Sequence, residues 1–82
     1  MFNMKSFNIQ LSSIMAVKEF VNIVNKCPYD IDLSSSRYVV DAKSIMGIFS
    51  LDLLNPILLT AHTDDAGELF EKLAPFIIKP EA

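Results

Sequence analysis

The chain has 82 residues, 51 % of them apolar, so it is long enough for one small domain and can bury a core without a metal or disulfide. Its net charge of −3, with scattered Lys and Arg, argues against a nucleic-acid partner, because such a partner requires a clustered basic face. Neither a run of ~20 apolar residues nor a basic start with a long apolar core is present, which predicts no membrane partner. The single Cys27 cannot form an internal disulfide, so we expect a reducing, cytoplasmic setting.

The N-terminal part of the chain predicts a strand followed by a helix. Residues 5–11 alternate apolar and polar side chains, as in a half-buried strand. Residues 12–26 change to helical spacing, with an apolar stripe at Ile14, Val17, Phe20, Val21 and Val24. Ser12 or Ser13 can cap this helix, and Pro28 ends it.

The middle of the chain predicts three further strands and a short helix. Residues 29–34 and 38–42 alternate and are joined by a short polar turn, which is typical of two neighbouring strands. Residues 44–54 predict a short apolar helix, although Gly47 inside it weakens the helix by ~1 kcal/mol relative to Ala. Residues 55–62 predict a strand that opens with a proline, which a strand tolerates at its first position.

The last predicted element is a helix over residues 65–78. Asp65 and Glu68 have the spacing of a capping box, and Pro75 is expected to kink or end the helix. The apolar stripe of this helix is Leu69, Phe70, Leu73, Phe76 and Ile77. The order is therefore β-α-β-β-α-β-α, an α+β chain in which one sheet face is covered by helices and the other faces water.

This order, and the stretch AKSIMGIFSL at residues 42–51, resembles HPr, the small phosphocarrier of the bacterial sugar phosphotransferase system. Around the regulatory serine of that family, Lys-Ser-Ile-Met-Gly leads into a short helix. Phe20-Val21 and the YDIDL stretch at residues 29–33 also fall where the family has similar residues. The resemblance covers nearly the whole chain. It implies a single HPr-like domain over residues 1–82, an open-faced β-sandwich with a four-stranded antiparallel sheet and three helices on one face.

The sequence departs from the family at the position that carries phosphate. HPr uses a Gly-(apolar)-His-x-Arg-Pro motif at the start of its first helix, whereas the matching stretch here reads QLSSIMAVKEF. With Phe20-Val21 kept in register, the histidine position falls at Ser13 and the arginine position at Met15. The only histidine, His62, ends the strand at 55–62 and is expected on the surface. We therefore expect that the phosphocarrier function is lost, as in the catabolite-repression HPr-like proteins, which keep the serine and lose the histidine.

Two interpretations of Ser44 remain open from the sequence. As a helix N-cap it would satisfy a backbone donor, worth ~1 kcal/mol, and as a phosphosite it would place a dianion at a helix N-terminus. The resemblance favours the second, because in the family a bifunctional kinase modifies this serine. We predict that Ser44 is a regulatory phosphoacceptor, that Lys43 adds a cation near the phosphate, and that Gly47 leaves room for a partner.

The residues after Ser44 carry the predicted docking surface. Ile48 and Leu51 have the spacing of a core pair, which would leave Ile45, Met46 and Phe49 partly outside as a docking surface beside Lys43. The alternative is that all of these side chains are core. The resemblance implies that HPr kinase or the family's catabolite regulator docks here, although the regulator also contacts the missing histidine and arginine.

The remaining polar residues suggest no chemistry of their own. No carboxylate cluster has the spacing of metal ligands, and Cys27 has no nearby histidine, so we expect no enzyme, no metal and no cofactor. The leading hypothesis is a non-catalytic HPr-like regulatory or interaction protein with protein partners. The alternatives are a residual phosphocarrier component of the phosphotransferase system and a structural or oligomerisation domain that kept only the fold.

Overall fold

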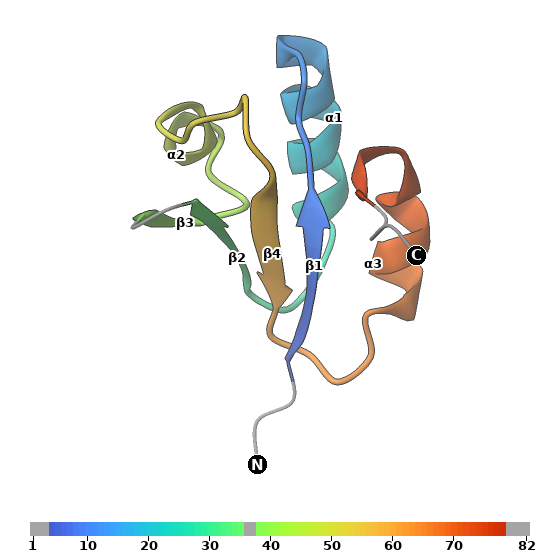
Figure 1. The fold of residues 1–82 in the computed structure, drawn as a ribbon. Helices are drawn as coiled ribbons and strands as arrows, with labels where there is room; N and C mark the ends of the chain where they lie inside the picture. The colour runs from blue at the N-terminus through green and yellow to red at the C-terminus, as the bar shows by residue number, and fades with distance from the viewer. Residues whose placement is uncertain (1–3, 36–37, 79–82) are drawn as a thin grey trace.

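The computed structural model describes residues 4–35 and 38–78, and its elements follow the predicted order (Figure 1). The elements are β1 (Lys5–Ile9), α1 (Ile14–Val24), β2 (Ile31–Ser35), β3 (Tyr38–Asp41), α2 (Ile45–Phe49), β4 (Ile57–Ala61), α3 (Gly67–Lys72) and a 3-10 turn (Ala74–Phe76).

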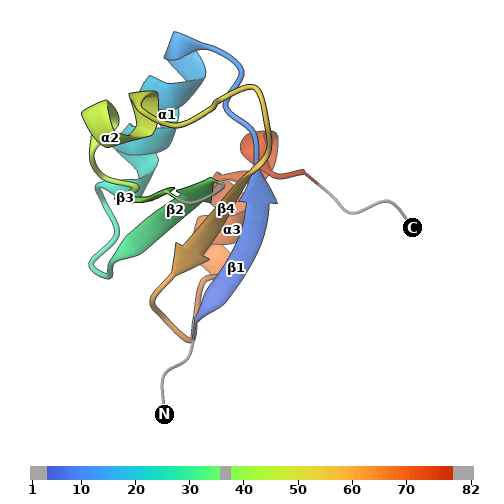
Figure 2. The same ribbon diagram turned by 60° about the vertical axis from the view of Figure 1, so that its left-hand side comes forward.

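The four strands form one antiparallel sheet in the order β1-β4-β2-β3. Leu59 of β4 stands between Phe7 and Leu33 of its neighbours, so the inward side chains of three strands lie in one row. α1 and α3 cover this face, and α2 lies against the side of α1 (Figures 1 and 2). The opposite face is largely polar, and the hydroxyl oxygens of Ser6 and Thr60 are 3.3 Å apart on it. The predicted α+β, open-faced arrangement is confirmed.

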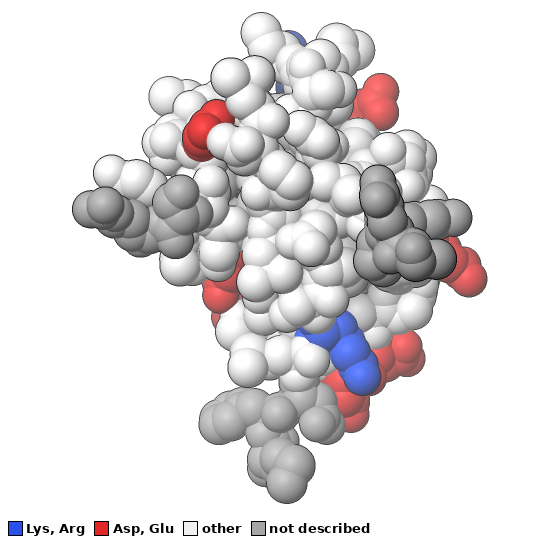
Figure 3. Space-filling model, viewed as in Figure 1, with Lys and Arg blue, Asp and Glu red and all other residues white. Residues whose placement is uncertain are grey.

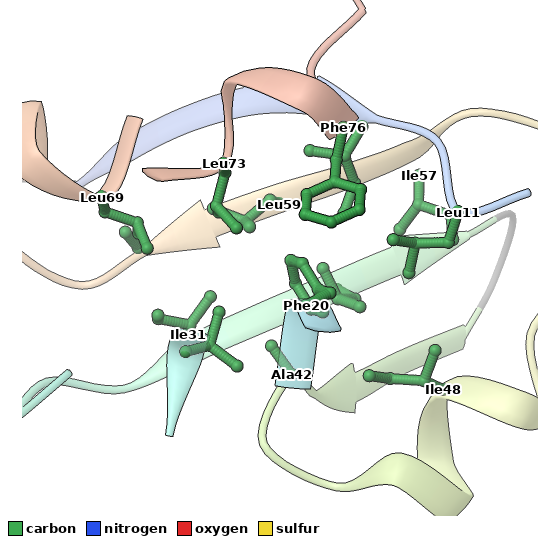
Figure 4. Close-up of a cluster of buried hydrophobic side chains, with 14 of the residues drawn as sticks. Leu11, Phe20, Ile31, Ala42, Ile48, Ile57, Leu59, Leu69, Leu73 and Phe76 are labelled. Atoms are coloured by element: carbon green, nitrogen blue, oxygen red, sulfur yellow. The ribbon is translucent and has the colours of Figure 1, made fainter. Parts of the chain in front are cut away.

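The core lies between this sheet and the helices, with Phe20 of α1 near its middle. Phe20 is fully buried, and its ring meets that of Phe76 edge to face, with centroids 6.2 Å apart and planes at 89°. Figure 4 shows the two rings facing one another beside Leu59. Ile14 was predicted to share the buried stripe of α1 but is 63 % exposed. The helix begins at this residue, and its first turn reaches past the end of β1, where the sheet no longer covers it (Figure 1).

The helix predicted over residues 44–54 is shorter than expected. α2 ends at Phe49, because the next two N–H groups bond three residues back, Ser50 to the Gly47 carbonyl at 3.1 Å and Leu51 to the Ile48 carbonyl at 3.0 Å. Bonds of this kind tighten the last turn of a helix. The Asp52 carboxylate then accepts the N–H of Leu54 at 3.1 Å, which turns the chain towards β4.

The predicted C-terminal helix also differs from expectation. Pro75 ends it as predicted: α3 stops at Lys72, and Pro75 lies in the separate 3-10 turn. The predicted capping box is wrong, because the N-cap is Ala66 and Asp65 reaches only the N–H of Gly67, at 3.4 Å. Glu68 instead pairs with Lys72 one turn later, at 2.9 Å. After the turn, Ile77 pairs antiparallel with Ile9, so the chain runs back along the edge of the sheet.

No helix in the described part of the chain combines the length and the apolar character that crossing a membrane requires.

Tyr29 makes the free energy of unfolding depend on pH in the alkaline range. It lies in a cleft of about 300 Å³ whose lining includes Cys27, Glu68 and Lys72. Burial, followed by a hydrogen bond with Cys27, raises the pKa of the Tyr29 hydroxyl from its usual 10.0 to about 12. The unfolded chain therefore loses this proton near pH 10, while the folded chain keeps it until about pH 12.

We expect the free energy of unfolding to fall between pH 10 and pH 12, because the contribution of Tyr29 is complete below pH 10 and is lost as the pH rises. A Tyr29→Phe variant removes this contribution and is expected to show a shallower decline. Urea unfolding of both proteins at a series of alkaline pH values measures the difference. Identical slopes for the two proteins would show that the folded state does not protect this hydroxyl.

Candidate phosphorylation and docking site

Ser13, which the resemblance to HPr places at the position of the family's histidine, caps the start of α1. Ser13 has extended backbone angles, and its hydroxyl oxygen accepts the N–H of Ala16 at 3.0 Å. Its carbonyl accepts the N–H of Val17 at 3.1 Å, the first bond of α1. Of the two serines predicted as possible caps, Ser13 is the one used. Met15, at the arginine position, is 64 % exposed and carries no charge.

Ser44 caps the start of α2, as Ser13 caps the start of α1. The turn from β3 holds it in place, because its N–H donates to the Asp41 carbonyl at 3.0 Å and its carbonyl accepts the N–H of Ile48 at 3.0 Å. Its hydroxyl oxygen accepts the N–H of Gly47 at 3.2 Å. The side chain is exposed, so a hydroxyl that caps the helix is at the same time accessible from solvent.

Gly47 has a different role from the one predicted. A Cβ atom at this position would lie 3.3 Å from the Ser44 hydroxyl oxygen and 3.3 Å from the Cβ of Val40. The space beside Gly47 is therefore filled by the chain itself and is not left for a partner. The glycine lets α2 pack closely on β3 while its N–H reaches the Ser44 hydroxyl.

The ammonium group of Lys43 is engaged away from the expected phosphate position. Its Nζ donates to the carbonyl oxygen of Cys27 at 2.9 Å, in a partly buried environment, and so ties the turn before α2 to the end of α1. The backbone N–H of Lys43 donates to the Asp41 carboxylate at 2.9 Å. In this arrangement Lys43 positions the Ser44 turn.

The three apolar residues predicted as a docking surface do not lie alike. Met46 is 76 % exposed and Phe49 40 % exposed, whereas Ile45 is partly buried and packs against the core. Ile48 and Leu51 are buried, as predicted for a core pair. α2 therefore turns one side into the core and presents Met46 and Phe49 to solvent.

Sequence reasoning missed two further members of this surface. Ile14 and Leu54 join Phe49 in the lining of a groove of about 420 Å³, together with Leu53 and residues 10–13. Leu54 is 88 % exposed. Helical periodicity assigned Ile14 to the core and placed Leu54 in the extended α2, so only the true ends of the two helices reveal the groove. We call the surface formed by Ile14, Met46, Phe49 and Leu54 the α1–α2 face.

His62 lies far from the start of α1. The strand register places Ile57 of β4 beside Ile9, at the end of the sheet next to α1, and Ala61 beside Lys5 at the other end. Four strand residues span ~13 Å, so His62, which follows Ala61, is at least that far along the sheet from the helix start. Its Nε2 lies 2.7 Å from a carboxylate oxygen of Asp32, and both side chains are partly exposed. As expected, it is a surface residue.

In the described ranges no three His, Cys, Asp or Glu side chains gather closely enough to hold a metal ion. Cys27 is partly buried, with its sulfur 4.0 Å from the Ile23 carbonyl oxygen.

Comparisons with known proteins agree with this geometry. A sequence model of the family described as "PTS HPr component phosphorylation site" matches residues 14–79. The solved phosphocarrier protein HPr from Bacillus anthracis str. Ames is 31 % identical, covers 92 % of this chain and 98 % of its own, and superposes with a TM-score of 0.71. HPr-C-His from Thermoanaerobacter tengcongensis is 29 % identical over 87 % of this chain and 88 % of its own, with a TM-score of 0.73. No curated protein gives a significant match. The family match over most of the chain and the fold shared with two solved HPr proteins show that this chain belongs to the HPr family.

Proposed function

We propose that residues 1–82 form one HPr-like domain that acts as a non-catalytic regulatory and interaction protein related to the sugar phosphotransferase system, controlled by phosphorylation of Ser44. The observation that carries this proposal is the exposed Ser44 hydroxyl at the start of a helix whose Met46 and Phe49 lie outside the core. A modifiable hydroxyl and an apolar contact surface are thus combined on one short segment.

The chemistry at the start of α1 supports a role other than phosphate transfer through a histidine. An imidazole nitrogen can carry a transferable phosphoryl group, whereas a serine hydroxyl would form a stable ester. The Ser13 oxygen is in addition occupied by the N–H of Ala16. Met15 offers no charge that would pair with a phosphate. His62, at the far end of the sheet, does not replace these residues.

A phosphate on Ser44 would meet a local environment with both favourable and unfavourable groups. The N–H of Gly47 already points at the hydroxyl oxygen and would favour the added negative charge. The Asp41 carboxylate bonds the N–H of Lys43, next to Ser44 in the chain, and would oppose it. Lys43 could turn its ammonium group to the phosphate only by leaving the Cys27 carbonyl. Phosphorylation would therefore act on the turn before α2 as well as on its surface.

The partner that this surface fits best is an HPr-type kinase. Met46 and Phe49 lie within five residues of Ser44, so an enzyme that modifies the hydroxyl can contact them at the same time. In the family the catabolite regulator also uses the histidine and arginine positions, which are Ser13 and Met15 here. We therefore propose that kinase docking is kept on this face and that regulator docking is weakened.

We expect an HPr kinase with ATP to add one phosphate to the wild-type protein and none to a Ser44→Asn variant. Asparagine is a good N-cap, so this variant removes the acceptor and keeps the start of α2. A Ser50→Ala variant, which lacks the other serine hydroxyl bound to Gly47, is the matched control and is expected to be labelled like wild type. Intact-protein mass spectrometry reads the outcome. An unlabelled wild type, or equal labelling of the Ser44→Asn variant, would reduce Ser44 to a helix cap.

A further inference from the structure

The α1–α2 face gathers a large share of the exposed apolar surface. Of the ten large hydrophobic side chains exposed in the described residues, four belong to it, with exposed fractions of 88 % for Leu54, 76 % for Met46, 63 % for Ile14 and 40 % for Phe49. Ile14, Phe49 and Leu54 line one groove, and Met46 is on the same short helix as Phe49. Exposed apolar residues grouped in this way on a small protein are typical of a protein-binding site. We therefore expect another molecule to bind this face.

The charges on and around the α1–α2 face limit which kind of molecule can bind it. The groove in this face is lined only by uncharged side chains, those of residues 10–14 and of Phe49, Leu53 and Leu54. Figure 3 shows the surface around α2 as uncharged apart from one acidic side chain. Asp52 adjoins the face, but its two carboxylate oxygens bind the Leu54 N–H at 3.1 Å and the Asn55 amide at 2.7 Å. A charged partner would find little complementary charge here, whereas a second copy needs none.

A neutral face matters because the chain as a whole carries a net charge of −3. Two copies repel one another when their acidic surfaces approach, and this repulsion is smallest where the contact surfaces are uncharged. The groove lining of the α1–α2 face meets that condition, and the carboxylate of Asp52, which adjoins the face, is bound by the Leu54 N–H and the Asn55 amide.

The shape of the face also suits contact with itself. In a two-fold dimer each patch must provide both a projection and a recess, because the same residues meet on both sides. The groove of about 420 Å³ supplies a recess, and Leu54 at its edge and Met46 on α2 are the two most exposed apolar side chains of the face. A weak interface covers ~600 Å² per copy. That area is roughly a tenth of the 5580 Å² surface of one copy, so a weak dimer would leave most of the surface of each copy exposed.

We propose that the α1–α2 face binds a second copy of this chain in a weak symmetric dimer, and that a phosphate on Ser44 separates the two copies. The observations that support the dimer are the exposure of the face, its uncharged groove and its shape. Its opening rests on the proposed function, the phosphorylation of Ser44. Ser44 is two residues before Met46 and exposed, so each copy would bring a dianion to the border of a dry apolar contact. Desolvation of the two phosphates and their mutual repulsion would oppose association.

Sedimentation equilibrium on the unmodified full chain tests the dimer. The expected dissociation constant is roughly 0.1 mM, and it is expected to change by less than about twofold between ~0.05 and ~0.5 M NaCl because no ion pairs hold the contact. Leu54→Glu is expected to raise it at least ~10-fold, since a charge would be buried without a partner. Val39→Glu is the matched control, because Val39 is 65 % exposed on the edge strand β3, and is expected to change it by less than about twofold. A monomer at ~1 mM, or equal effects of the two variants, would overturn the dimer.

A pair of Ser44 variants tests the opening without a kinase. Aspartate and asparagine both cap helices well, so Ser44→Asp and Ser44→Asn differ mainly in charge. The aspartate variant is expected to raise the dimer dissociation constant at least ~10-fold relative to the asparagine variant, and equal constants would overturn the switch. A protein that stays monomeric but is labelled at Ser44 by the kinase would overturn the dimer and leave the proposed phosphorylation in place. A dimer without kinase labelling would remove the proposed phosphorylation and leave the dimer standing.

Discussion

Replacing Phe20 by alanine is expected to lower the free energy of unfolding by about 3–5 kcal/mol, the range for removing a fully buried aromatic ring. Phe20 is 0 % exposed and packs edge to face on Phe76, so the cavity would open in the middle of the core. Domains of this kind have total stabilities of ~5–15 kcal/mol, so the loss would leave a small domain close to unfolding.

Urea unfolding of this variant beside Phe70→Ala is the measurement. Phe70 is 46 % exposed and meets Phe7 edge to face at 5.3 Å, so its removal is expected to cost only about 1–2 kcal/mol. Equal losses for the two variants would mean that the ring of Phe20 is not at the centre of the core.

Replacing Met46 by glutamine is expected to lower the kcat/KM of an HPr kinase for this protein about tenfold or more. Burying a methionine side chain in a complex is worth ~1.5–3 kcal/mol, and glutamine of similar length would lose most of it. Because Met46 is 76 % exposed, the free energy of unfolding should change by less than about 0.5 kcal/mol. The loss is therefore expected in docking and not in folding.

Steady-state phosphorylation of the Met46→Gln variant, with Val39→Thr as a control, separates the two effects. Val39 is 65 % exposed on β3 and lies outside the α1–α2 face, so the control should be phosphorylated like wild type. A Met46→Gln variant with unchanged kcat/KM would show that the kinase reaches Ser44 without contacting α2.

Most of the fold could be predicted from the sequence, because the strands are set by alternation and by the burial of one sheet face. Ile31 and Leu33 are buried and point inward, as the alternating pattern of β2 required. Helix ends were predicted less well. Periodicity continues through residues 50–54, yet the Asp52 side chain bonds the Leu54 N–H and turns the chain, a local contact that an apolar pattern does not encode.

The candidate site could be predicted in part. The position of Ser44 at the start of a helix follows from the change of period after β3, and the structure places its hydroxyl at that cap. The hydrogen bond of Lys43 to the Cys27 carbonyl could not be predicted, because it joins residues 16 positions apart through a side chain that the sequence analysis placed beside the expected phosphate. The contribution of Leu54 was missed for a similar reason, since it depends on where α2 ends.

The measurement that tests the central claim most directly is to offer this protein two phosphoryl donors in parallel and map the product by peptide mass spectrometry under conditions that preserve phosphohistidine. One reaction contains phosphoenolpyruvate and the first enzyme of the phosphotransferase system, and the other contains ATP and an HPr kinase. We predict phosphate on Ser44 in the ATP reaction and no phosphate in the other, because neither Ser13 nor Met15 replaces the family's histidine and arginine. Acid-labile phosphate on His62 in the phosphoenolpyruvate reaction, or an unmodified Ser44 in the ATP reaction, would contradict it.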